Sequence, residues 1–448
     1  MQKDKGSKKI KQPYLNISPY NDLALDDRFT ACVGINGDYD QNTICDGFNN
    51  AVRILIDSLK TSNETADTLV YPILFCFRHA LELYLKDVYH SVKFIYNAKT
   101  HRDIFVKLQK MYRIKFRILQ QIEMCKELSS LDNTLSCKGI VNKRINILNK
   151  RLKMINKEIK SSEECYVQED RGIYTHDLCI LKEKILKIYK IDERIPEVFD
   201  PVLQYLSPYE KIDPHGDAFR YLGDHKGHHH FKKKNIELVN LSTVAEHHKE
   251  LSGLLDKVQI TLGYLQEEYC TGTFTSFLSR KQLENISKIL PKPDEYDDKI
   301  QESREFIKKQ YNLGSDGFEE ALEIIRKHRE FSCNMGKEIV FDHLSQSTLE
   351  KLSECAKGRL DWNLVGDDIS INELCLLWTF SEISGWKYGE NNQYYSENLY
   401  ALYRSAKFNR RITLYDICPK RDIGHIITGM KKCGQKKYAD ILSEYTKM

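Results

Sequence analysis

Helix-breaking residues are scarce in this sequence. Its 448 residues include only 10 prolines and 22 glycines, and long stretches contain neither. Leucine, isoleucine, lysine and glutamate recur at helical spacing through those stretches, which is typical of amphipathic helices. The sequence therefore predicts an all-α protein.

Long apolar runs and paired cysteines are also missing. No run approaches 18 apolar residues, so we expect no membrane span. The segment Met1–Lys9 has no apolar stretch behind it and predicts no signal peptide. The 13 cysteines are odd in number and form no C-x-x-C pair, a usage typical of a reducing compartment. We therefore expect a cytoplasmic protein.

Common catalytic and phosphate-binding motifs are absent as well. The chain has no Walker loop, no G-x-G-x-x-G, no G-x-S-x-G and no H-E-x-x-H. We expect no cofactor and no metal. One alternative stays open, because His225 and the run His228–His230 lie near several aspartates. Adjacent histidines rarely converge on one ion without a helical scaffold, so a solvated loop is the favoured interpretation.

Charge is distributed unevenly, although the net charge is only +4. Residues 101–160 hold 15 Lys and Arg against 5 Asp and Glu, whereas residues 161–403 carry a net charge of −13. Apolar stripes on both sides of a break near Leu131–Ser136 predict a helical hairpin at 101–162 with a basic exterior. A solvated face, docking onto acidic surfaces of the same chain, and nucleic-acid binding all fit this pattern. The candidate nucleic-acid-binding residues are Lys107, Lys110, Arg113, Lys115, Arg117, Lys143, Arg144, Lys150 and Arg151.

The most apolar long segment runs from Tyr71 to Lys86 and predicts a central, largely buried helix, with Pro72 in its first turn. Arg78, Glu82 and Lys86 recur every four residues, so they share one polar face. This stripe fits either a buried ion pair that shapes the fold or one wall of a site.

Further helices are expected at 44–60, 175–190 and 242–269, which with the central helix would form an antiparallel bundle. We expect a polar arm at 1–40, the bundle at 41–270 with the hairpin inserted at 100–170, and a second small helical domain at 280–448. Thr175 is the expected N-cap of the third bundle helix.

Two of these helices carry sequence motifs that resemble those of the HEPN family (higher eukaryotes and prokaryotes nucleotide-binding). The motifs are RHALELYLK at 78–86 and THDLCIL at 175–181. A third motif, DAFRYLGD at 217–224, stands where the family has Arg-Tyr-Pro, with Leu222 in place of the proline. The resemblance covers about residues 44–270.

The resemblance implies a four-helix bundle, often a homodimer, and in catalytic members a metal-independent endoribonuclease. Such members use an Arg with a His four to six residues on, and Arg220 and His225 have that spacing. It also implies a role in prokaryotic antiphage defence or a toxin system. The alternative is a non-catalytic module that binds nucleic acid, a nucleotide or a partner protein, the last through 280–448. Expected partners are RNA, with DNA or a nucleotide as alternatives, and a second copy of the chain. Arg220 and His225 are expected to lie in a loop, and the residues expected to support their chemistry are Arg78, His79, Glu82 and His176. In one possible arrangement, Arg78, His79 and Arg220 form an anion pocket.

Overall fold

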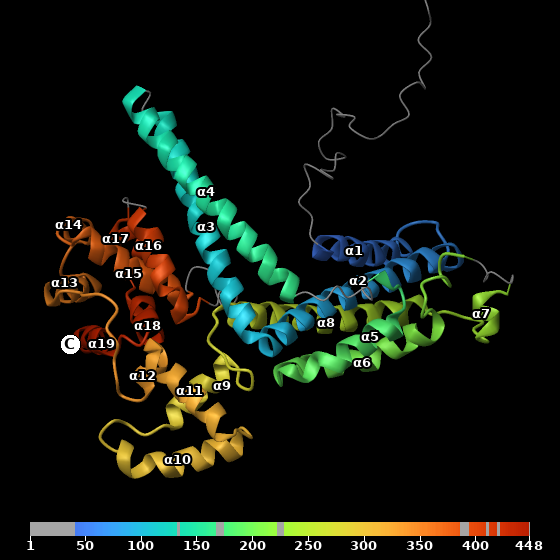
Figure 1. The fold of residues 1–448 in the computed structure, drawn as a ribbon. Helices are drawn as coiled ribbons and strands as arrows, with labels where there is room; N and C mark the ends of the chain where they lie inside the picture. The colour runs from blue at the N-terminus through green and yellow to red at the C-terminus, as the bar shows by residue number, and fades with distance from the viewer. Residues whose placement is uncertain are drawn as a thin grey trace, which may run out of the picture.

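The structure of the chain is a computed structural model. It describes residues 41–131, 135–166, 174–221, 228–385, 394–408, 412–418 and 422–447. These residues are mostly helical and contain no β-strand, as the sequence predicts (Figure 1). In the same ranges, no helix is both long enough and apolar enough to cross a membrane. The expected polar arm at 1–40 lies outside the described residues.

The central helix α2 spans Ala66–Thr100 and is longer than expected. It begins five residues before Tyr71, so Pro72 lies inside the helix rather than in its first turn. A proline inside a helix removes one backbone hydrogen bond. Several residues that follow it are buried, with Ile73 and Phe77 at most 1% exposed. Tertiary burial therefore offsets the local cost of the proline, which sequence reasoning alone could not weigh.

Among the described residues, the main hydrophobic core is built around α2 mostly by four further helices. These are α1 (Gln41–Ser58), α5 (Leu178–Ile188), α6 (Arg194–Ile212) and α8 (Leu241–Cys270). Helices α1, α2, α5 and α8 match the four expected segments, and α6 joins them with buried residues such as Phe199. The N-cap of α5 is Asp177 and not Thr175, because the Asp177 carboxylate accepts hydrogen bonds from the N–H groups of Cys179 and Ile180.

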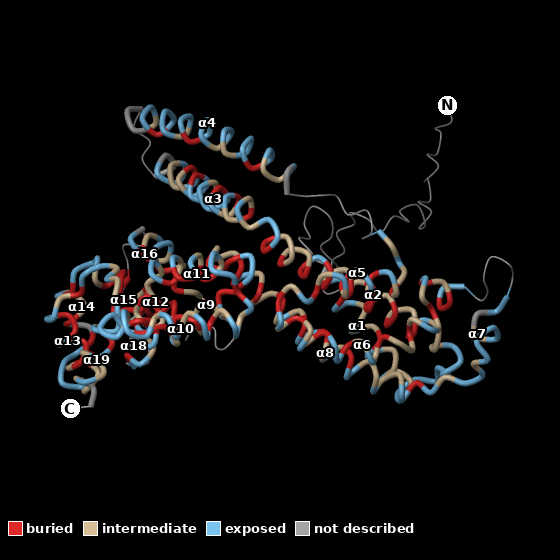
Figure 2. Tube along the Cα trace, turned by 60° about the horizontal axis from the view of Figure 1, so that its bottom comes forward, coloured by how far each residue is buried: buried red, intermediate tan, exposed pale blue. Residues whose placement is uncertain are grey.

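The predicted basic hairpin is confirmed as α3 (Arg102–Leu131) and α4 (Leu135–Tyr166). The two helices pack against each other and extend away from the rest of the chain (Figure 1). At 1.5 Å per residue each helix is about 45 Å long. Only a thin inner seam is buried, with Leu148 fully enclosed, while most of α4 is exposed (Figure 2).

Residues 280–447 contain two hydrophobic clusters. The first is built mainly from α9 (Arg280–Ile289), α10 (Tyr296–Gln310), α11 (Ser315–Lys327) and α12 (Arg329–Asn334). The second is built mainly from α13 (Gln346–Ala356), α14 (Trp362–Asp367), α15 (Ile371–Ser384), α16 (Leu399–Phe408), α17 (Leu414–Ile417), α18 (Gly424–Lys432) and α19 (Lys436–Lys447).

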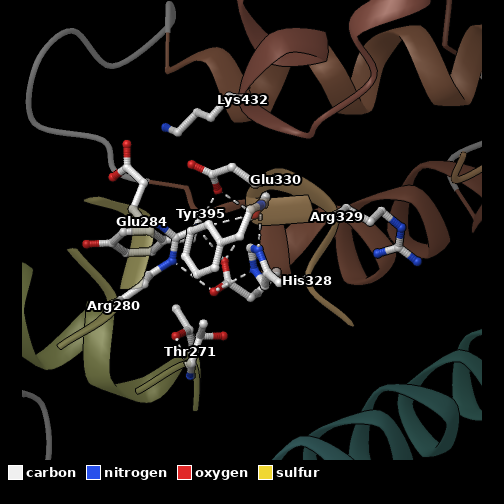
Figure 3. Close-up of polar contacts among 12 residues, drawn as sticks. Thr271, Arg280, Glu284, His328, Arg329, Glu330, Tyr395 and Lys432 are labelled. Carbon is white, nitrogen blue, oxygen red and sulfur yellow. Dashed lines mark hydrogen bonds and ion pairs between the residues drawn. The ribbon is translucent and has the colours of Figure 1, made fainter. Parts of the chain in front are cut away.

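A buried arginine joins these two clusters (Figure 3). The Arg280 side chain, on α9, donates hydrogen bonds to Glu330 of α12 and to both carboxylate oxygens of Glu397, at 2.8 and 3.0 Å. Its guanidinium carbon lies 5.1 Å from the ring centroid of Phe331 and 4.8 Å from that of Tyr395. All of these contacts lie between packed segments of the chain, so we interpret the group around Arg280 as a structural junction between the two hydrophobic clusters.

Candidate functional site

The candidate site is centred on a buried carboxylate of α2. Glu82 is 1% exposed and accepts a hydrogen bond from Arg78 at 2.7 Å and one from Lys86 at 2.6 Å. The Nδ1 atom of His176, which precedes α5, lies 2.7 Å from Oε1 of Glu82, the oxygen that also accepts from Lys86. Burial alone raises the pKa of Glu82, but the hydrogen bonds from Lys86 and His176 outweigh it and the pKa lies below its ordinary value. Glu82 is therefore ionised at neutral pH.

Arg78 anchors a loop to this carboxylate. Its Nε donates to the carbonyl oxygen of Asp213 at 3.2 Å, and its Nη2 donates to the carbonyl oxygens of Pro214, at 3.1 Å, and His176. The side chain is 3% exposed. Because the guanidinium is enclosed and directed at backbone carbonyls, it is not open to an external phosphate. The structure thus corrects the expectation that Arg78 would belong to an anion pocket.

The loop that follows α6 is held in shape by a second buried carboxylate. Asp213 is 3% exposed, and its Oδ1 accepts three backbone hydrogen bonds, from Gly216, Asp217 and Ala218, at 2.9, 2.8 and 3.0 Å. Gly216 has φ +86°, a left-handed conformation that favours glycine. Asp213 was considered from the sequence only as one of the aspartates near the histidines, and its capping role was not predicted, although an aspartate before a Pro-x-Gly turn favours this kind of side-chain cap.

Arg220 is an exposed residue of this loop. Its guanidinium carbon is 5.2 Å from the ring centroid of Phe75 on α2. The imidazole of His79 stacks on the same ring, with a centroid distance of 5.8 Å and an interplanar angle of 6°. Burial lowers the pKa of His79; Glu82 opposes this shift, whereas Arg220 and Arg78 add to it. His79 is therefore neutral at neutral pH, the form that accepts a proton.

The structure thus brings five of the predicted residues together at one end of the bundle: Arg78, His79, Glu82, His176 and Arg220. His225, the expected partner of Arg220, lies outside the described residues. Within the described ranges, no group of three or more His, Cys, Asp or Glu side chains is placed to hold a metal ion.

The second candidate region is the basic surface of the hairpin. The nine predicted basic residues are exposed, apart from the half-buried Lys115. Arg113 donates hydrogen bonds to the carbonyl oxygens of Cys270 and Thr271, so it also ties the hairpin to the end of α8. The other eight form no ion pair with a described residue. These eight are Lys107, Lys110, Lys115, Arg117, Lys143, Arg144, Lys150 and Arg151.

Comparisons with known protein families, curated proteins and solved structures find no match. The resemblance to the HEPN family therefore rests on the short sequence motifs alone.

Proposed function

We propose that this chain binds RNA through the α3–α4 hairpin. The observation that carries the proposal is the set of exposed basic side chains on the hairpin that have no acidic partner among the described residues. Such charges gain most from a polyanion, because basic side chains replace the counterions condensed on its phosphates and release them. A single nucleotide is too short to reach side chains spread along helices of about 45 Å. RNA, rather than DNA, is chosen because of the HEPN resemblance.

The packing of the helices around α2 supports a related proposal, that α1, α2, α5 and α8 form a HEPN-like bundle. On this proposal the basic hairpin is inserted between the second and third bundle helices, and the protein acts as a homodimer.

RNA binding is tested by fluorescence anisotropy with a labelled single-stranded RNA of about 20 nucleotides between 50 and 200 mM salt. We expect the double variant Lys143→Glu/Lys150→Glu to bind at least tenfold more weakly. Its slope of log K against log salt should fall by about 1.4, the value for two lost phosphate contacts on a single strand. The control is Lys309→Glu/Lys431→Glu, which makes the same charge change on exposed residues elsewhere. Equal weakening in both variants, or binding that does not depend on salt, would refute the assigned surface.

A second candidate function is RNA cleavage at the loop that carries Arg220. The observation that favours it is an exposed guanidinium in a loop that Asp213 and Arg78 hold in place. A guanidinium in this position would bind the scissile phosphate and stabilise its developing charge. An imidazole, of His225 as in catalytic HEPN members, would take the proton of the attacking 2′-hydroxyl. A role in prokaryotic defence or in a toxin system would follow from this activity.

Cleavage is tested by incubating a labelled RNA with the wild-type protein and with the variants Arg220→Ala and His225→Ala, in the presence of a metal chelator. We expect cleavage by the wild type and a loss of at least 100-fold in each variant. Equal cleavage by all three proteins would place the activity elsewhere. If the wild type binds RNA but does not cleave it, the cleavage proposal is refuted and only the RNA-binding function remains.

A further inference from the structure

A line of large apolar side chains runs along the exposed side of α4. Ile140, Ile147 and Met154 are 69%, 53% and 66% exposed. They are seven residues apart, so they lie close to a single line along the helix, about 21 Å long. The inner face of α4, which packs against α3, is made by other residues, among them Leu148 and Ile159. The hairpin therefore leaves a second apolar seam open.

Basic rows border this seam on both sides. Lys143, Lys150 and Lys157 follow the apolar residues by three positions, and Arg144 and Arg151 follow Ile140 and Ile147 by four. Residues three and four positions apart are neighbours on a helix surface, one to each side. Residues 138–157 contain no aspartate or glutamate. The seam is therefore flanked by basic side chains beside Ile140 and Ile147, and by Lys157 on one side and Glu158 on the other beside Met154.

Phosphate binding accounts for the basic rows but not for the apolar seam. Isoleucine and methionine side chains form no hydrogen bond or ion pair with a phosphate. Keeping each of them exposed to water costs free energy in proportion to its apolar area. Apolar residues at seven-residue spacing stay aligned with a partner helix in a left-handed supercoil. The seam thus fits a helix better than it fits a nucleic-acid backbone.

The positive charge of the Lys and Arg rows beside the seam determines which kind of partner helix can bind there. Pairing this face with the same face of a second copy would place Lys and Arg rows opposite one another, which is unfavourable. We infer that α4 docks an amphipathic helix of another protein, whose apolar stripe covers Ile140, Ile147 and Met154 and whose flanks carry aspartate or glutamate. This docking surface goes beyond RNA binding and does not depend on it.

The test uses a synthetic 21-residue peptide as the probe. Its leucines lie on one face of a helix, with glutamates on both flanks; the control peptide has the same composition in scrambled order. Binding of each labelled peptide is measured by fluorescence anisotropy at 150 mM salt. We compare the wild type with Ile140→Ser/Ile147→Ser and with a matched pair, Ile54→Ser/Ile260→Ser, which changes exposed isoleucines on α1 and α8.

We expect the wild type and the matched pair to bind the amphipathic peptide at least tenfold more tightly than the scrambled one. The Ile140→Ser/Ile147→Ser variant should lose this preference and keep its RNA affinity within twofold. Equal affinity for both peptides, or binding of neither, would overturn the inference. A wild-type dimer in sedimentation that becomes monomeric in Ile140→Ser/Ile147→Ser would also overturn it, because a second copy would then cover the seam. Failure of RNA binding would refute the proposed function and leave the peptide result standing.

Discussion

Replacing Arg78 by methionine should release the loop that carries Arg220. The carbonyl oxygens of Asp213 and His176 would each lose a donor, whereas Pro214 would keep the hydrogen bond from Leu178, at 3.1 Å. A buried polar group left without a partner costs about 1–3 kcal/mol. Since Glu82 would retain its bonds from its other partners, we expect a local loss of about 3 kcal/mol, near the lower end for a broken buried ion pair.

Hydrogen exchange is the appropriate assay, because a chain with three large hydrophobic clusters is not expected to unfold in one step. A loss of about 3 kcal/mol corresponds to exchange about 100-fold faster at the amides that Asp213 binds, those of Gly216, Asp217 and Ala218. The matched control is Lys86→Met, which removes a cation from Glu82 but no contact to the loop. Unchanged exchange in Arg78→Met would refute the reasoning. An equal increase in Lys86→Met would show that the carboxylate, and not the carbonyl contacts, holds the loop.

Two further predictions concern the C-terminal packing. A Cβ on Gly429 would lie 1.8 Å from a backbone oxygen of α15, so Gly429→Ala should force α18 away and cost about 3 kcal/mol or more, measured by hydrogen exchange at the amides of α18. The control Gly253→Ala, with open space around the Cβ, should stabilise α8 by up to about 1 kcal/mol. Burial alone raises the pKa of Glu397, but His328 and Arg280 hold it well below its usual range. Its stabilising contribution is therefore present above about pH 4.3 and lost as the pH falls through the lower, folded-state pKa. Near-UV circular dichroism should show an acid transition that is reduced in Glu397→Gln, and an identical transition in both proteins would contradict the assignment.

The elements that sequence reasoning placed well are those with local signals. The hairpin expected at 101–162 appears as α3 and α4, because apolar residues at helical spacing and a short polar break act within a few turns of the chain. The start of α2 was misplaced because proline is a strong local signal for the first turn of a helix. Burial of the residues beyond it, a tertiary effect, decided the outcome.

The candidate site shows the same division. Spacing alone placed Arg78 and Glu82 on one face of a helix, as the structure confirms. Spacing could not show that Arg78 binds the carbonyl of Asp213, 135 positions later, and is closed to an external anion. Nor could it show that His79 shares the Phe75 ring with Arg220.

The sequence by itself determined that the chain is all-α, that the hairpin carries an excess of basic charge, and which face of the central helix is polar. These properties follow from the composition and from the 3.6-residue period of the helix, which are local. The tertiary structure alone decided which charges are enclosed and which stay open to a partner. That division depends on which segments pack together, and partners such as Arg280 and Glu397 are more than a hundred residues apart.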